Sequence, residues 1–139
     1  LFLQDLPSDV YAAPFDVRLP LTAHQLKSYQ VDTVVQPDIC VVCDRERLDG
    51  RGCIGAPDLI VEILSPGNCR NEVRDKYELY QAGGVTEYWV VFPAEQVLQR
   101  YILNAEQLYQ AQLPNVEGDV VDITFLPGFE LAVGEIFQE

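Results

Sequence analysis

Residues 56–92, APDLIVEILSPGNCRNEVRDKYELYQAGGVTEYWVVF, contain the clearest secondary-structure pattern of this chain. Its two apolar runs, at 59–64 and 86–92, have the length and composition of buried β-strands. Between them, a helical pattern extends from about 69 to 81, after a turn with proline and glycine and before a glycine pair suited to end a helix. The order strand, helix, strand predicts the central unit of a layered protein.

The flanking sequence supplies further strands but few helices. Residues 10–19 show patchy alternation interrupted by Pro14, which predicts an edge strand broken at that proline. Loops are expected at 21–33 and 44–55, where polar, charged and glycine residues gather. The pattern predicts one domain over residues 1–139, built as a mixed central β-sheet of the α/β or α+β type. The other strands are expected at 34–43, 97–103, 107–113 and 119–126.

Glu62 is the most informative residue, because it stands in the middle of the apolar run at 59–64. Removing a carboxylate from water in a central strand costs several kcal/mol unless something compensates the charge. A metal ion, a paired cation or a raised pKa can provide that compensation. The plainer alternative is an edge strand on which Glu62 faces water.

Strand alternation brings a second carboxylate towards Glu62. If the strands at 34–43 and 59–64 pair antiparallel through the intervening loop, Asp38 comes level with Glu62. Two adjacent carboxylates repel each other, and Mg²⁺ removes that cost, since it favours one or two carboxylates, several waters and a substrate phosphate. Asp58 shares the face of Glu62 but lies ~13 Å away along the strand, so it is expected to be a turn or strand-entry residue.

Lys76 is the candidate for the cation that a phosphoryl-transfer site needs near the attacking water and the developing charge. On the predicted helix it shares a face with Glu72 and Tyr80, four residues away on either side. The alternative is an ordinary surface lysine that pairs with Glu72.

Four motifs, in this order along the chain, resemble a known family. They are PD at 37–38 within VVQPDICVVCD, the segment APDLIVEILSP, the lysine-bearing helix that ends in YQAGGV, and TEYWVV. Together they resemble the Uma-type family of bacterial endonucleases, once classed as a domain of unknown function, within the PD-(D/E)XK restriction-endonuclease-like superfamily. The resemblance extends from APFDVRL at 13–19 to the EIF tail.

The resemblance implies a restriction-endonuclease-like fold and an endonuclease that uses Mg²⁺ or Mn²⁺ to hydrolyse phosphodiester bonds in DNA. It implies that Asp38, Glu62 and the backbone carbonyl of Ile63 are metal ligands. Lys76 would then be the catalytic lysine, with Glu72 as an auxiliary acidic residue.

The chain also departs from the family pattern. Leu64 stands two residues after the acid, where the wider superfamily has its lysine; in the Uma-type family a lysine on the next helix takes that place, which matches Lys76. Phe92 precedes Pro93 where the family commonly has an aspartate, and the family's N-terminal helix is expected to be missing. These departures leave an alternative, a catalytically inactive module of the same fold that acts in protein or nucleic-acid association, expected as a homodimer.

The formal net charge of −13 disfavours a general DNA-coating role, because phosphate binding relies on lysine and arginine. Six of the nine basic residues nevertheless fall within one stretch, which predicts either a local basic lip or solvated loop and helix faces. These six basic residues are Arg45, Arg47, Arg51, Arg70, Arg74 and Lys76.

No apolar run approaches the length needed to cross a bilayer, so no membrane association is expected.

The cysteines form a C-x-x-C pair at Cys40 and Cys43, which invites a zinc interpretation. Positions three apart in a strand point to opposite faces, so free buried thiols, typical of a cytoplasmic protein, are the better interpretation for this pair. The chain has two further cysteines, Cys53 and Cys69. A serine–histidine hydrolase is disfavoured, because no G-x-S-x-G surrounds Ser65 and the single histidine, His24, lies in a polar segment.

Overall fold

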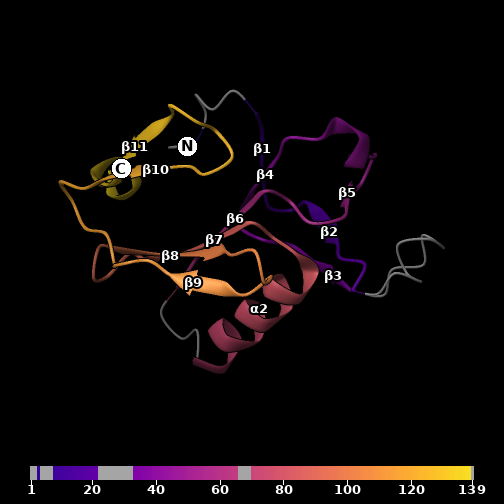
Figure 1. Cartoon of the computed structure of the whole chain (residues 1–139), viewed down its shortest axis with the longest axis horizontal. Coiled ribbons are helices and arrows are strands. Elements are labelled where there is room, and N and C mark those ends of the chain that lie inside the picture. The colour runs from indigo at the N-terminus through magenta and orange to yellow at the C-terminus, as the bar shows by residue number, and fades with distance from the viewer. Residues whose placement is uncertain (1–2, 4–7, 22–32, 66–69, 139) are drawn as a thin grey trace.

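The computed structural model describes residues 3, 8–21, 33–65 and 70–138 of the chain. Its centre is a six-stranded mixed sheet with the strand order β1-β4-β6-β7-β8-β9 (Figure 1). Within this sheet the central pair β6–β7 is parallel and all other neighbours are antiparallel. This confirms the predicted mixed sheet. The strands are β1 (Asp9–Ala12), β4 (Ile39–Val42), β6 (Leu59–Ile63), β7 (Glu87–Phe92), β8 (Val97–Leu103) and β9 (Tyr109–Ala111).

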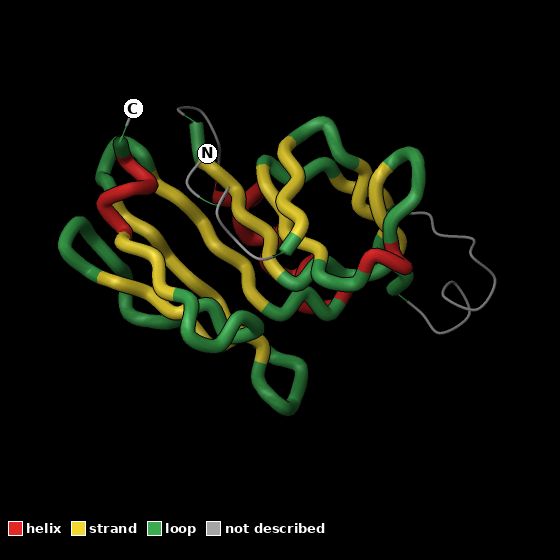
Figure 2. The backbone as a smooth tube through the Cα atoms, turned by 90° about the horizontal axis from the view of Figure 1, so that it is seen from above, coloured by secondary structure: helices red, strands yellow, loops and turns green. Residues whose placement is uncertain are grey.

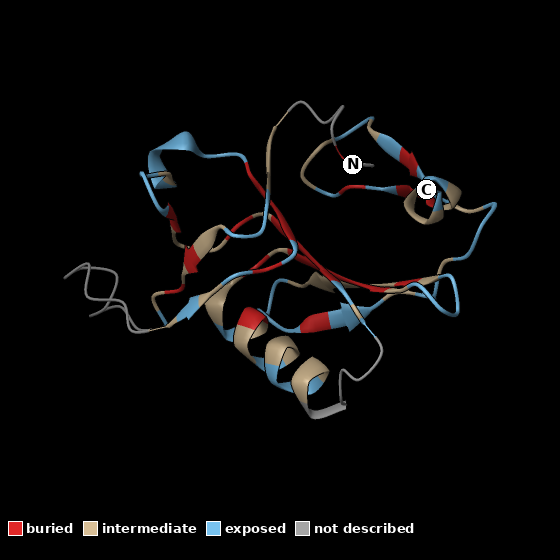
Figure 3. Ribbon diagram, turned by 180° about the vertical axis from the view of Figure 1, so that it is seen from behind, coloured by how far each residue is buried: buried red, intermediate tan, exposed pale blue. Residues whose placement is uncertain are grey.

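Alternation along the central strands divides the apolar side chains between two cores, one on each face of the sheet. Val61 and Trp89 belong to one core, and Ile60 and Tyr88 to the other. The central strands are buried along most of their length, while the outer loops are exposed (Figure 3). A sheet covered on both faces explains why its central strands read as continuous apolar runs.

Helix α2 (Arg70–Gly83) connects β6 to β7 and covers one face of the sheet (Figure 1). A parallel pair requires such a crossover, because its strands begin at the same end of the sheet. The helix ends at a glycine cap, as predicted: Gly84 has a φ of 84°, and its N–H donates to the Gln81 carbonyl at 3.2 Å. The N–H of Val85 donates to the Tyr80 carbonyl at 3.1 Å, which completes a Schellman motif.

The strand predicted at 10–19 is in fact two strands in different sheets. β1 is an edge strand that ends before Pro14, as predicted, whereas β2 (Asp16–Arg18) lies in the middle of a second sheet of order β3-β2-β5. That sheet stands beside the large one when the molecule is seen from above (Figure 2). The edge prediction is therefore wrong for β2. Its neighbours are β3 (Val34–Val35) and β5 (Gly52–Ile54).

The segment 44–55, predicted as a loop, contains the short 3-10 helix η1 (Arg45–Arg47) and strand β5. β5 pairs in parallel with β2. Gly52 allows this pairing, because a Cβ at that position would collide with the backbone carbonyl of Asp16. The glycine read as a loop residue in the sequence is thus a point of close backbone approach.

The C-terminal segment packs on the face of the large sheet opposite α2 (Figure 1). It forms a two-stranded antiparallel sheet of β10 (Val120–Asp122) and β11 (Glu130–Ala132), followed by the 3-10 helix η2 (Val133–Phe137). The strand predicted at 119–126 is therefore shorter than expected.

No helix in the described part of the chain is long and apolar enough to span a membrane. One predicted feature, the loop position of His24, lies outside the described residues.

Candidate active site

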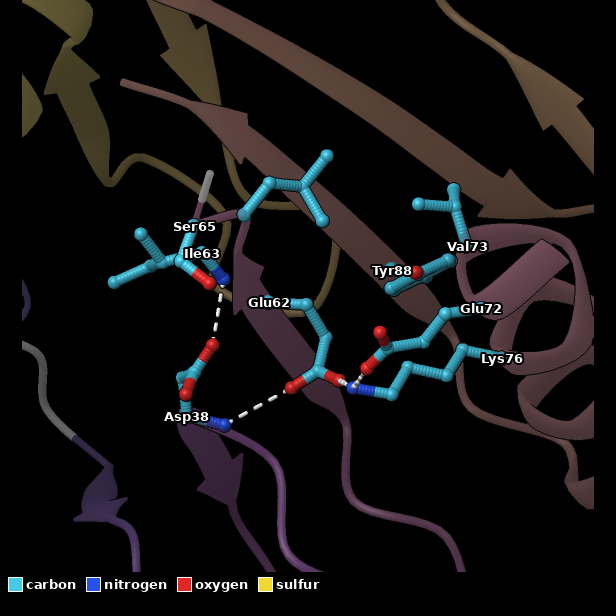
Figure 4. Close-up of a pocket in the computed structure, with 9 residues that line it drawn as sticks. Asp38, Glu62, Ile63, Ser65, Glu72, Val73, Lys76 and Tyr88 are labelled. Carbon is cyan, nitrogen blue, oxygen red and sulfur yellow. Dashed lines mark hydrogen bonds and ion pairs between the residues drawn. The ribbon is translucent and has the colours of Figure 1, made fainter. Parts of the chain in front are cut away.

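Asp38 and Glu62 meet at one end of the central sheet, as strand alternation predicts. β4 and β6 pair antiparallel with Ile39 opposite Val61, so the residue before Ile39 comes level with the residue after Val61. The backbone N–H of Asp38 donates to Glu62 Oε1 at 3.0 Å. In return, the N–H of Ile63 donates to Asp38 Oδ2 at 2.7 Å (Figure 4). These bonds fix both carboxylates at the strand ends.

Glu62 is 3% exposed, so its carboxylate is buried and its charge needs a compensating partner, as predicted. Lys76 of α2 forms an ion pair with Glu62 Oε2, and its Nζ also lies 3.4 Å from Glu72 Oε1 (Figure 4). The hydroxyl of Tyr80 donates to Glu62 Oε2 at 3.4 Å. Because positions 72, 76 and 80 are one helical turn apart, they present their side chains on one face of α2. The edge-strand alternative for Glu62 is wrong. Lys76 pairs with Glu72, as its alternative expected, and in addition with the buried Glu62.

The surroundings keep Lys76 charged and Tyr80 protonated at neutral pH. Burial alone would lower the pKa of Lys76, but the carboxylates of Glu62 and Glu72 outweigh it, so the pKa is raised above its usual value. Burial and the charge of Glu62 raise the pKa of Tyr80. Both groups therefore act as hydrogen-bond donors to the carboxylate.

The two carboxylates and Lys76 open into one polar cavity of about 220 Å³. Ser65 also lines it, as does Tyr88 (Figure 4). The sequence does not single out Tyr88 as a site residue, because its place in the strand pattern TEYWVV also indicates ordinary core packing. The cavity-lining residues are Asp38, Glu62, Ile63, Leu64, Ser65, Glu72, Val73, Lys76 and Tyr88.

The donor set of the cavity fits a hard divalent cation. The described residues include no group of three or more His, Cys, Asp or Glu side chains placed to hold an ion together. Mg²⁺, however, needs only one or two carboxylates beside waters and substrate phosphate, and Asp38 and Glu62 can provide these. Because the N–H and C=O of a strand residue point to the same side, the Ile63 carbonyl is expected on the edge that faces Asp38.

Other predicted site features lie elsewhere. Asp58 accepts a hydrogen bond from the N–H of Cys43 at 2.8 Å, which confirms it as a strand-entry residue. Cys40 and Cys53 are buried free thiols, and burial raises the pKa of each, to about 12 and about 11. Cys43 is exposed, with its Sγ 3.0 Å from Ser8 Oγ, so the prediction of a buried thiol is wrong there. Cys69 lies outside the described residues.

Three arginines of the basic stretch form ion pairs on the surface of the described part of the chain. Arg45 pairs with Asp9, Arg47 with Asp44, and Arg74 with Glu78. Because these arginines face carboxylates of the same chain, the interpretation as solvated loop and helix faces is the one that the described residues favour.

A mixed sheet with one crossover helix, and two acidic residues facing a lysine at the ends of its central strands, are features of the restriction-endonuclease-like class. Comparison with solved structures supports the same fold. A crystal structure from Anabaena variabilis, of "a putative nuclease belonging to DUF820", is similar with a TM-score of 0.66. It is 20% identical, and the match covers 94% of this chain and 68% of that chain.

The sequence of the chain identifies the protein family to which it belongs. Residues 4–134 match the family described as "Uma2: Putative restriction endonuclease", so the chain belongs to the Uma2 family. This confirms the resemblance found in the motifs and places the chain in a nuclease family. A search of curated proteins found no match.

Proposed function

We propose that this protein is a Mg²⁺-dependent endonuclease that hydrolyses phosphodiester bonds in DNA. The observation that carries the proposal is the convergence of Asp38, Glu62 and Lys76, from two strands and a helix, on one polar cavity. Membership of the Uma2 family supports the reaction class. The identity of the metal and of the nucleic acid is part of the proposal.

Each residue has a role that its position allows. Asp38 and Glu62, with the Ile63 carbonyl, would hold Mg²⁺ at the ends of the central strands. When bound, Mg²⁺ polarises the phosphate and lowers the pKa of a water molecule. Lys76 would turn from Glu62 and donate to a phosphate oxygen as negative charge develops there. Water would attack phosphorus and lose a proton to the solvent, the bond from phosphorus to the leaving oxygen of the sugar would break, and that oxygen would take up a proton from the solvent. Glu72 keeps Lys76 beside the cavity.

The position of Lys76 also bears on the alternative of an inactive module. Leu64 stands where the wider superfamily has its lysine, and this favours inactivity. In the folded chain, however, Lys76 reaches the carboxylate of Glu62 from α2, so a cation is present in the cavity without a lysine at position 64.

A cleavage assay tests the proposal. Supercoiled plasmid and single- and double-stranded oligonucleotides are incubated with the protein and Mg²⁺, Mn²⁺ or EDTA. We expect cleavage with either cation, none with EDTA, and a loss of at least about a hundredfold in Glu62→Gln, since a metal ligand is removed.

The matched control is Glu87→Gln, which makes the same chemical change to a buried carboxylate outside the cavity and should retain activity per folded molecule. Metal-independent cleavage, or equal rates in wild type and Glu62→Gln, would contradict the proposal. Specific metal-independent binding of nucleic acid without cleavage would support the inactive module instead.

A further inference from the structure

Tyr80 makes a contact with the site that packing alone does not require. Its side chain is fully buried in α2, and its hydroxyl donates to Glu62 Oε2 at 3.4 Å. Lys76, one helical turn earlier, contacts the same oxygen. The other oxygen, Oε1, accepts the N–H of Asp38 at 3.0 Å and therefore faces the second acidic residue. Two donors thus hold the oxygen of Glu62 that lies away from Asp38.

We propose that Tyr80 is a positioning residue that holds Glu62 Oε2, so that Oε1 stays turned towards Asp38 and available to a divalent cation. The inference rests on the proposed function, because it assigns the metal-facing oxygen of that same site. A carboxylate oxygen that accepts one N–H keeps a second lone pair for a cation. Held at Oε2, the carboxylate cannot rotate that lone pair away from Asp38.

Lys76 and Tyr80 differ in mobility, and this gives the two donors different roles. Lys76 has a side chain that is 33% exposed and a flexible four-carbon stem, so it can turn towards a substrate phosphate. Tyr80 is confined by edge-to-face packing against Tyr88, with ring centroids 5.1 Å apart. Once Lys76 leaves, Tyr80 would still donate to the buried carboxylate and keep its orientation. A partner behind a metal ligand commonly accounts for 10–100-fold in metal affinity.

Tyr109 provides a matched control within the same core. It is also buried, and its hydroxyl donates to the Val85 carbonyl at 2.7 Å rather than to a residue of the cavity. Tyr109→Phe and Tyr80→Phe each remove one buried hydroxyl. A purely structural role for Tyr80 predicts that the two variants differ only in thermal stability.

Mn²⁺ binding by the full chain, followed by electron paramagnetic resonance of the free ion, separates the possibilities. We expect Tyr80→Phe to weaken Mn²⁺ binding by about tenfold and Tyr109→Phe to leave it unchanged. Equal binding by wild type and Tyr80→Phe would overturn the inference while leaving the metal site of the proposed function intact. An absence of binding by wild type would overturn the metal site itself, and the inference with it.

A second measurement keeps the hydroxyl and does not depend on how well Tyr80→Phe folds. 3-Fluorotyrosine is placed at position 80 or 109, and its ¹⁹F resonance is followed during a Mg²⁺ titration. We expect the resonance at position 80 to shift with saturation and that at position 109 to stay in place. No shift at position 80 while the protein binds Mg²⁺ would contradict the inference.

Discussion

Two buried carboxylates in the central sheet, Glu62 and Glu87, are matched in burial and opposite in setting. Glu62 is 3% exposed and Glu87 is fully buried. Glu62 faces α2, pairs with a lysine and opens into a cavity. Glu87 lies on the other face and accepts hydrogen bonds only from neutral donors among the described residues: Trp89 Nε1 at 3.1 Å, and the N–H and hydroxyl of Thr124 at 2.8 Å and 2.7 Å.

Burial of a carboxylate therefore does not by itself indicate a reactive site. Glu87 Oε2 accepts two hydrogen bonds from Thr124, which tie the C-terminal segment to the sheet, while its Oε1 accepts from Trp89. Glu62 pairs with Lys76 and accepts from Asp38 and Tyr80, and it lines a polar cavity together with Asp38 and Lys76. Glu87 therefore stabilises the fold, whereas Glu62 is placed where it can bind a ligand.

The largest expected effect on stability comes from Glu87. Glu87→Gln puts an amide NH₂ where a carboxylate oxygen now accepts, so a buried donor of Trp89 or Thr124 loses its partner. We expect the free energy of unfolding to fall by about 2 kcal/mol, measured by urea denaturation. An unchanged free energy of unfolding would show that Glu87 does not fasten the C-terminal segment.

A smaller effect is expected from Lys76→Met, which leaves Glu62 with neutral donors only, as Glu87 now has. Removing one partner of a fully buried pair costs about 3–5 kcal/mol, and partial exposure of Lys76 reduces this to about 1–2 kcal/mol. Mn²⁺ should restore much of that loss, because it takes over the compensation of Glu62. If the cation stabilised Lys76→Met no more than wild type, the lysine and the metal would not share this carboxylate.

The sequence predicts the placement of Asp38 and Glu62 because strand alternation and antiparallel pairing are local rules with few alternatives. Lys76 follows from helical spacing together with the family motifs. Glu87 escapes prediction, since it stands at a strand entrance in TEYWVV and its partner Thr124 is 37 residues further along the chain. Strand β5 escapes for the same reason, because its partner β2 lies far back in the sequence and its glycine resembles a loop signal.

The assignment of Asp38 and Glu62 as a metal site is tested most directly by the shift in melting temperature that Mn²⁺ causes in wild type, Glu62→Gln and Glu87→Gln. A ligand at about 100 times its Kd stabilises the folded state by about 2.7 kcal/mol. We predict a clear upward shift for wild type and for Glu87→Gln, which starts from a lower melting temperature, and none for Glu62→Gln. An equal shift in all three proteins, or none in wild type, would contradict the assignment of Glu62 and Asp38 as the metal site.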